Sequence, residues 1–167
     1  MKKFFLLAVA VMCATVVAYG STVQYRDIVK CRAANKGIYG VRSMADGEHF
    51  TIIKGKQIVR CSYADRADSL LLFSGELKIG SYLFSHDERQ ILLSDAKSVK
   101  PIYRHSATAD YYLAEVGGKA RKVLEQVRDV EFMPDGKNLI YAQGNNLYLY
   151  NLATSASKAI TTDGEWN

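Results

Sequence analysis

The chain has 167 residues, of which 49% are hydrophobic and 23% are charged, and its formal net charge is +5. The length suits about one domain. Basic and acidic residues are well mixed, and no Lys/Arg run or basic stripe with interleaved aromatic residues occurs. The charge pattern therefore excludes nucleic acid as the expected partner.

The first 20 residues have the layout of a secretory signal. Two lysines precede an almost unbroken apolar run, Phe4 to Ala18, and Ala18-Tyr19-Gly20 places small residues where a signal peptidase reads the chain. An apolar run of this length falls short of the roughly 20 residues that cross a bilayer core. It therefore favours a cleaved signal over a transmembrane anchor. We expect export to the periplasm or the medium, with no membrane attachment after cleavage.

Cysteines and histidines give weaker signals. Beyond the signal lie Cys31 and Cys61, and exported proteins can keep disulfides. Nothing in the spacing shows that these two cysteines meet, so a bridge and two separate thiols both stay open. Lipidation at Cys13 is a further alternative, although Met12 stands where a small residue is needed. The three histidines have no Cys or His at metal-ligand spacing, so we expect no metal and no cofactor.

A short turn pattern recurs three times, each time between two apolar half-strands. The copies are SMADGE (43–48), FSHDER (84–89) and FMPDGK (132–137). Their aspartates lie 41 and 48 residues apart. A fixed period of this size indicates a modular array, in which one supersecondary unit cannot bury its apolar face without neighbours.

Short runs rich in Val, Ile, Leu, Phe and Tyr predict three units of four strands. In chain order the predicted strands are 39–43, 50–53, 57–62 and 69–73, then 80–84, 90–93, 110–116 and 120–124, then 127–132, 138–142, 146–151 and 159–161. Repeated four-stranded antiparallel modules are typical of β-propeller blades, and a β-sandwich is the alternative. We expect an all-β chain with a lead-in segment and three blades, at 21–35, 36–76, 77–126 and 127–167.

The second unit departs from the other two between its second and third strands. This connection has three residues in the first and third units but 16 in the second, Ser94 to Ala109. Loops this long are usually functional or disordered, and the apolar and aromatic content of Pro101–Ser106 favours packing. The connection leaves the face opposite to the Asp turns. Arg104 in this connection can bind a carbonyl, carboxylate or phosphate through the coplanar N–H donors of its guanidinium. The alternative is a surface ion pair with an acid such as Asp110.

Several segments resemble the amino-terminal part of dipeptidyl peptidase IV. They are RSMADGEHF (42–50), YRHSATADYY (103–112), and VEFMPDGK (130–137) followed by NLYL (146–149). The likeness is closest to bacterial secreted members of the prolyl oligopeptidase clan, and it covers roughly residues 22–167. The Arg-His-Ser stretch is its most specific part, because Asp-Gly turns alone fit many propellers.

This resemblance implies an eight-bladed propeller joined to a carboxy-terminal α/β-hydrolase domain. The implied activity is that of a secreted serine-type dipeptidyl peptidase that releases Xaa-Pro or Xaa-Ala dipeptides. Arg104 would reach into the active-site cavity and bind a substrate carbonyl, with His105 in a packing or hydrogen-bonding role. The implied partners are a peptide substrate, the remaining blades, the hydrolase domain and a second copy, since relatives are often homodimeric.

The sequence also departs from that family. Its members carry a pair of substrate-binding glutamates just beyond the point that matches Trp166-Asn167, and their Ser, Asp and His lie far downstream. No Gly-x-Ser-x-Gly elbow occurs in this sequence, so we expect no catalytic residue and no activity of the chain alone. Three blades cannot close an eight-bladed ring, so we expect a fragment of a longer enzyme. The alternatives are a secreted propeller-like module that acts through protein contacts, and a self-associating unit whose copies close a ring.

Overall fold

The computed structural model describes residues 39–65 and 68–165. The chain divides into two units, Met1–Gly37 and Ile38–Asn167, and every described residue lies in the second. The predicted signal, the lead-in segment and Cys31 lie outside the described residues. Within the described ranges, no helix is long and apolar enough to cross a membrane.

The described residues form twelve β-strands and no helix, which confirms the all-β prediction. The strands are β1 (Arg42–Ser43), β2 (His49–Lys54), β3 (Gln57–Ser62), β4 (Ser69–Ser74), β5 (Ile79–Phe84), β6 (Gln90–Asp95), β7 (Lys100–Tyr103), β8 (Ser106–Glu115), β9 (Arg121–Phe132), β10 (Asn138–Gln143), β11 (Asn146–Asn151) and β12 (Ser157–Ala159). Most are six residues long, and β6 is buried at four successive positions, Ile91–Ser94, so both of its faces are covered.

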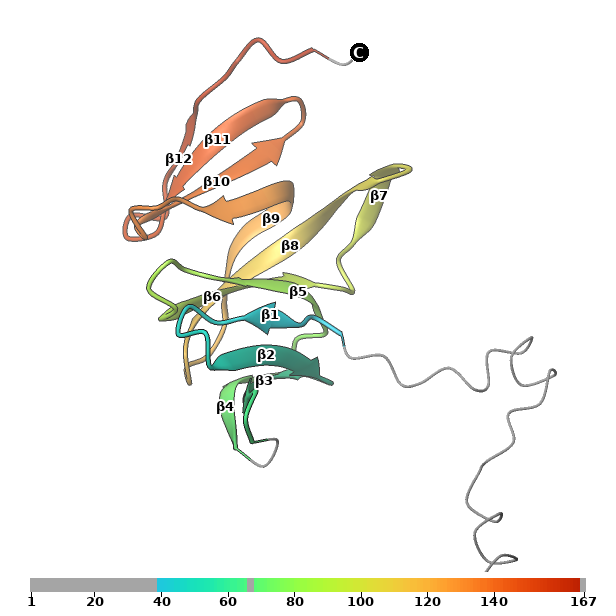
Figure 1. Cartoon of the computed structure of the whole chain (residues 1–167). Helices are drawn as coiled ribbons and strands as arrows, with labels where there is room; N and C mark the ends of the chain where they lie inside the picture. The colour runs from blue at the N-terminus through green and yellow to red at the C-terminus, as the bar shows by residue number, and fades with distance from the viewer. Residues whose placement is uncertain (1–38, 66–67, 166–167) are drawn as a thin grey trace, which may run out of the picture. The chain divides into compact units, whose positions relative to one another are not determined.

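The first four strands make an antiparallel sheet in the order β1-β2-β3-β4 (Figure 1). In the β2–β3 hairpin, Lys54 pairs with Gln57, so the turn consists of Gly55 and Lys56. Gly55 has a φ of +64°, a left-handed conformation that glycine adopts without a steric penalty. The predicted hairpin is confirmed, but its turn is one residue shorter than the predicted three-residue connection, because Lys54 is part of β2.

The remaining strands make a second antiparallel sheet in the order β12-β11-β10-β9-β8-β6-β5, with β7 paired to β8 outside this path. Strand β9 connects the part of this sheet formed by β5, β6 and β8 with the part formed by β10–β12. Leu124 of β9 pairs with Tyr111 of β8, and Phe132 of β9 pairs with Leu139 of β10. The two strands predicted at 120–124 and 127–132 are thus one bent strand, and that detail of the prediction was wrong. No Gly or Pro interrupts this stretch, and register shifts in both ladders accommodate the bend.

The three Asp turns share a hydrogen bond from the N–H two residues on to the aspartate, which makes the sequence repeat a structural repeat. Each aspartate Oδ1 accepts backbone N–H groups that follow it: Asp46 from Glu48 (2.9 Å) and His49 (3.0 Å), Asp87 from Arg89 (3.2 Å), and Asp135 from Lys137 (2.8 Å) and Asn138 (3.1 Å). In the Asp87 turn, the N–H three residues on, that of Gln90, donates to Ser85 Oγ instead. The residue after each aspartate has a positive φ: Gly47 (+71°), Glu88 (+55°) and Gly136 (+63°). A short carboxylate suits such turns because it bonds the backbone two and three residues on.

Two apolar clusters form the core. The first joins the four-stranded sheet to β5, β6 and β8 and comprises Ile58, Leu72, Phe73, Ile79, Tyr82, Ile91, Leu93 and Ala114. The second lies along β6, β9, β10 and β11 and comprises Leu92, Leu124, Val127, Val130, Leu139, Tyr141 and Tyr150. Adjacent residues of β6 thus point into different clusters, because successive side chains in a strand face opposite sides of the sheet.

A buried tyrosine ties the two sheets together. The side chain of Tyr82 on β5 is 1% exposed; its hydroxyl donates to the Gly40 carbonyl and lies 2.6 Å from Thr51 Oγ1 of β2. Since that hydroxyl gives its proton to Gly40, Thr51 acts as the donor in the second contact. Burial raises the pKa of the Tyr82 hydroxyl, against the lowering effects of the Thr51 hydrogen bond and the Arg42 charge.

Candidate functional site

The long connection of the second unit folds into a hairpin. Strand β7 pairs with the start of β8, with Lys100 opposite Thr108 and Tyr103 opposite Ser106. The sequence pattern predicts a loop here, and this was wrong, because the segment is largely strand. The pairing gives the backbone groups of an extended segment partners that a loop would lack.

Arg104 and His105 form the two-residue turn at the tip of this hairpin. Figure 1 shows the tip on the side of the fold opposite to the β1–β2, β5–β6 and β9–β10 turns, which carry the three aspartates. Both turn residues are exposed, and the neighbouring Tyr103 side chain is 72% exposed. The hairpin therefore presents a cation and two rings to the solvent.

The side chain of Arg104 makes no ion pair with any residue in the ranges 39–65 and 68–165. The predicted alternative, an ion pair with Asp110, does not form, because Asp110 Oδ2 lies 2.9 Å from Lys122 Nζ instead. The Arg104 guanidinium is thus exposed and without a carboxylate partner among the described residues.

A hydrogen-bond network holds the base of the hairpin. Gln126 of β9 donates through Nε2 to the Ser98 carbonyl and to Asp110 Oδ1, both at 2.9 Å, and accepts at Oε1 from Thr108 Oγ1 at 3.0 Å. The Ser98 hydroxyl in turn accepts the backbone N–H of Asp110 at 2.7 Å. These contacts connect the segment before β7 with strands β8 and β9.

Asp110 is the charged centre of this network. Burial by itself would raise the pKa of its carboxyl, but hydrogen bonds from Lys122 and Gln126 outweigh burial, and the pKa lies below its ordinary value. The same interaction raises the pKa of Lys122. Both groups are charged near neutral pH, so the network does not depend on titration there.

Arg128 forms hydrogen bonds to the hairpin nearer its tip. Its guanidinium donates to Ser106 Oγ at 3.4 Å and to the Gly144 carbonyl at 3.0 Å. Ser106 begins β8 directly after the Arg104-His105 turn, and Gly144 lies in the β10–β11 turn. The guanidinium thus connects the Arg104 hairpin to a turn that lies two strands away in the same sheet.

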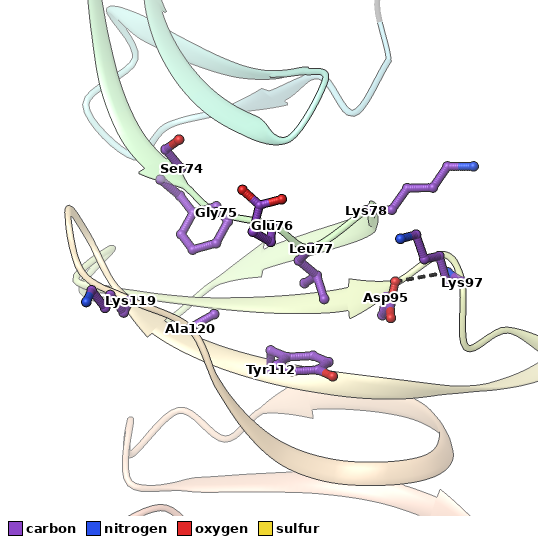
Figure 2. A pocket seen from close by; sticks show the side chains of 11 residues that line it. Ser74, Gly75, Glu76, Leu77, Lys78, Asp95, Lys97, Tyr112, Lys119 and Ala120 are labelled. Atoms are coloured by element: carbon purple, nitrogen blue, oxygen red, sulfur yellow. Dashed lines mark hydrogen bonds between the residues drawn. The ribbon is translucent and has the colours of Figure 1, made fainter.

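A pocket of about 500 Å³ lies elsewhere, where β4 leads into β5. In Figure 2, Leu77 and Tyr112 approach this pocket from opposite sides, and Lys78, Lys97 and Lys119 surround it. Neither Arg104 nor His105 lines it. The pocket and the predicted substrate-binding residue are therefore separate features of the fold.

Cys61 is buried and free among the described residues. Because Cys31 lies outside those residues, a bridge between them and two separate thiols both stay open. Among residues 39–65 and 68–165, no group of three or more His, Cys, Asp or Glu side chains could hold a metal ion.

Sequence reasoning singled out Arg104 but missed the residues that hold its hairpin, Gln126 and Arg128. A lone glutamine or arginine within an apolar strand pattern gives no signal of this kind. The only sequence cue was the length of the connection, which showed that this unit differs from its neighbours.

Comparison with known proteins identifies the region that carries this hairpin. Residues 85–167 match the family described as "Dipeptidyl peptidase IV (DPP IV) N-terminal region". The chain carries a dipeptidyl peptidase IV N-terminal region. The matched residues include the Arg104 hairpin and two of the three Asp turns. No curated protein matches the sequence.

Similarity to solved structures extends over more of the chain than the family match. The crystal structure of Porphyromonas gingivalis dipeptidyl peptidase 4 is 29% identical, with a TM-score of 0.70, and the match covers 89% of this chain and 23% of that one. A protein described as a TolB from Agrobacterium tumefaciens is 16% identical, with a TM-score of 0.52, over 74% of this chain and 45% of that one. The second likeness concerns the fold alone. The chain thus has a propeller-like fold and spans about a quarter of the length of the Porphyromonas protein.

Proposed function

We propose that the chain forms the amino-terminal part of the propeller of an exported serine-type dipeptidyl peptidase. Such an enzyme releases Xaa-Pro or Xaa-Ala dipeptides from free amino termini. The main support is the likeness to Porphyromonas gingivalis dipeptidyl peptidase 4, which covers 89% of this chain but 23% of that one. In this proposal the chain supplies scaffold and substrate contacts, and the nucleophile belongs to a hydrolase domain that this sequence does not contain.

The proposed blades follow the strand pairing. Strands β1–β4 form the first blade, β5, β6, β8 and the first half of β9 form the second, and the rest of β9 with β10–β12 forms the third. Further blades, the hydrolase domain and a second copy are the proposed protein partners. Secretion to the periplasm or medium is proposed from the amino-terminal signal pattern.

Arg104 is the proposed substrate-binding residue. It lies at a hairpin tip, is exposed, and has no carboxylate partner among the described residues. A guanidinium offers several donors in a fixed plane, so it can hold a peptide carbonyl by charge-assisted hydrogen bonds. Such bonds are worth roughly 1.5–3 kcal/mol. His105 would support the turn or donate a weaker contact.

A chimera tests this proposal. Residues 22–167 would replace the matching segment of the Porphyromonas enzyme, and release of p-nitroaniline from an Xaa-Pro-p-nitroanilide would be measured. We expect Arg104→Ala to lower kcat/KM by roughly 10- to 100-fold, which corresponds to the loss of one charge-assisted hydrogen bond. Arg89→Ala is the matched control, because Arg89 is an exposed arginine in an Asp turn on the opposite side.

Two results would contradict the proposal. One is a folded chimera that releases no dipeptide, or in which Arg104→Ala is as active as Arg89→Ala. The other is turnover of the same substrate by the 167-residue chain alone, since this would require a nucleophile within it.

A further inference from the structure

We infer that Gln126 is a positioning residue for Arg104. Its side-chain amide clamps the base of the β7–β8 hairpin and thereby fixes the direction in which the tip points. This inference rests on the proposed function for its consequence in catalysis, whereas the clamp itself is a property of this fold and can be measured without a substrate.

The amide of Gln126 makes three hydrogen bonds to two segments of the chain, the residues before β7 and strand β8. Its Nε2 donates to the Ser98 carbonyl before β7 and to Asp110 Oδ1 on β8, and its Oε1 accepts from Thr108 Oγ1, also on β8. A side-chain amide carries two N–H donors and a carbonyl acceptor at the same end, which these three contacts require. Glutamate lacks the donors, and alanine lacks all three contacts.

The backbone at Gln126 is shaped for this contact. Between the pairs Ala109–Val127 and Tyr111–Leu124 the ladder shifts register, so two residues of β9 oppose Asp110 alone. Gln126 has a φ of +49°, which is uncommon for a side chain other than glycine. Its N–H donates to Asp110 Oδ1 at 3.0 Å. A bulge re-aims a side chain, and here it directs the Gln126 amide to the hairpin base.

Nearby charged groups stabilise the hydrogen bond between Gln126 and Asp110. Lys122 Nζ lies 2.9 Å from Asp110 Oδ2, so Asp110 stays ionised and accepts from Gln126 through the other oxygen. Glu125 lies 3.2 Å from the same ammonium. Loss of the Gln126 amide would leave the Ser98 carbonyl and the Thr108 hydroxyl without this partner. The segment before β7 would then lose its side-chain hydrogen bond to β9, while β8 would keep its backbone pairing with β9.

The first test uses amide hydrogen exchange in the full 167-residue chain. We expect exchange across residues 99–108 to become about tenfold faster in Gln126→Ala, because local opening loses its side-chain tether. Gln57→Ala is the control, since Gln57 is exposed and lies in the other sheet. Gln126→Gly is the second variant. Glycine suits the positive φ, so this variant removes the amide and relieves the backbone, and it should accelerate exchange as well.

The two variants at position 126 distinguish the effect of losing the side-chain amide from the effect of backbone strain. Faster exchange of the hairpin in both variants, with Gln57→Ala unchanged, supports the clamp. Unchanged exchange in Gln126→Ala, or faster exchange in Gln126→Ala together with wild-type protection in Gln126→Gly, would overturn it, since the amide would then contribute nothing.

The second test is a double-mutant cycle in the active chimera. If Gln126 acts through Arg104, Gln126→Ala should raise KM several-fold and lower kcat less, and it should have no further effect when Arg104 is already alanine. Additive losses would show an independent structural role and overturn the inference. If Arg104→Ala leaves kcat/KM unchanged while Gln126→Ala still accelerates exchange in the hairpin, the proposed function is refuted and the role of Gln126 at the hairpin base is retained.

Discussion

Single residues set the local geometry of this fold, and the three turn aspartates show how. Each carboxylate accepts backbone N–H groups or a neighbouring hydroxyl, and each pKa is lowered. The leading causes are the Glu48 N–H for Asp46, the Ser85 hydroxyl for Asp87, and the Lys137 N–H for Asp135. Ionised aspartate is therefore the form that the fold prefers at these positions.

We expect Asp135→Ala to lower the melting temperature by a few degrees, because the Lys137 and Asn138 N–H groups lose their acceptor. Asp135→Asn should cost less, since its amide oxygen still accepts. Asp163→Ala is the control, an exposed aspartate outside the Asp turns. Equal melting temperatures for Asp135→Ala and Asp163→Ala would contradict this reading.

The same aspartates predict acid sensitivity. Their folded-state pKa values lie below the unfolded ones, so their stabilisation is complete above the unfolded value of about 3.9 and is lost as the pH falls through the folded values. Thermal unfolding should show a decline in stability below about pH 4. A variant with all three aspartates changed to asparagine should decline less over that range, and an identical decline would count against the turns as its source.

At the scale of elements, strand pairing followed the sequence pattern closely except around the second unit. Short apolar runs bounded by turn residues located the strands near Ile58, Ile91 and Leu139, because strands buried on one or both faces need such runs. They did not reveal the continuity of β9, since its bend uses positive φ at Gln126 and Asp129 without glycine. Sequence reasoning reached Arg104 through an anomalous loop length, but the clamp on its hairpin depends on a bulge that only the structure shows.

The hydrogen bonds of the Tyr82 hydroxyl let us predict how much this contact between the two sheets contributes to the free energy of unfolding. Tyr82→Phe should lower the free energy of unfolding by about 1–3 kcal/mol, because the Gly40 carbonyl and Thr51 hydroxyl lose a buried partner. Tyr103→Phe, at an exposed position, is the control and should change little. Urea denaturation measures both, and a Tyr82→Phe protein as stable as the wild type would show that the hydroxyl is not needed.

For the whole molecule, exposed apolar side chains on β4 predict self-association of the chain on its own. Leu70 and Leu71 are 47% and 49% exposed, and a strand with such residues at the edge of a sheet invites pairing. We expect light scattering to show a mass that rises with concentration, and Leu70→Ser/Leu71→Ser to reduce it. A concentration-independent monomer would contradict this expectation.

The central claim is that Arg104, held on its hairpin, binds substrate within a dipeptidyl peptidase. A crystal structure of the chimera with a bound Xaa-Pro inhibitor tests it most directly. We predict a guanidinium nitrogen of Arg104 within about 3.2 Å of an inhibitor carbonyl oxygen, the range of an N–H···O hydrogen bond. An occupied inhibitor site with Arg104 turned away into solvent would contradict the account.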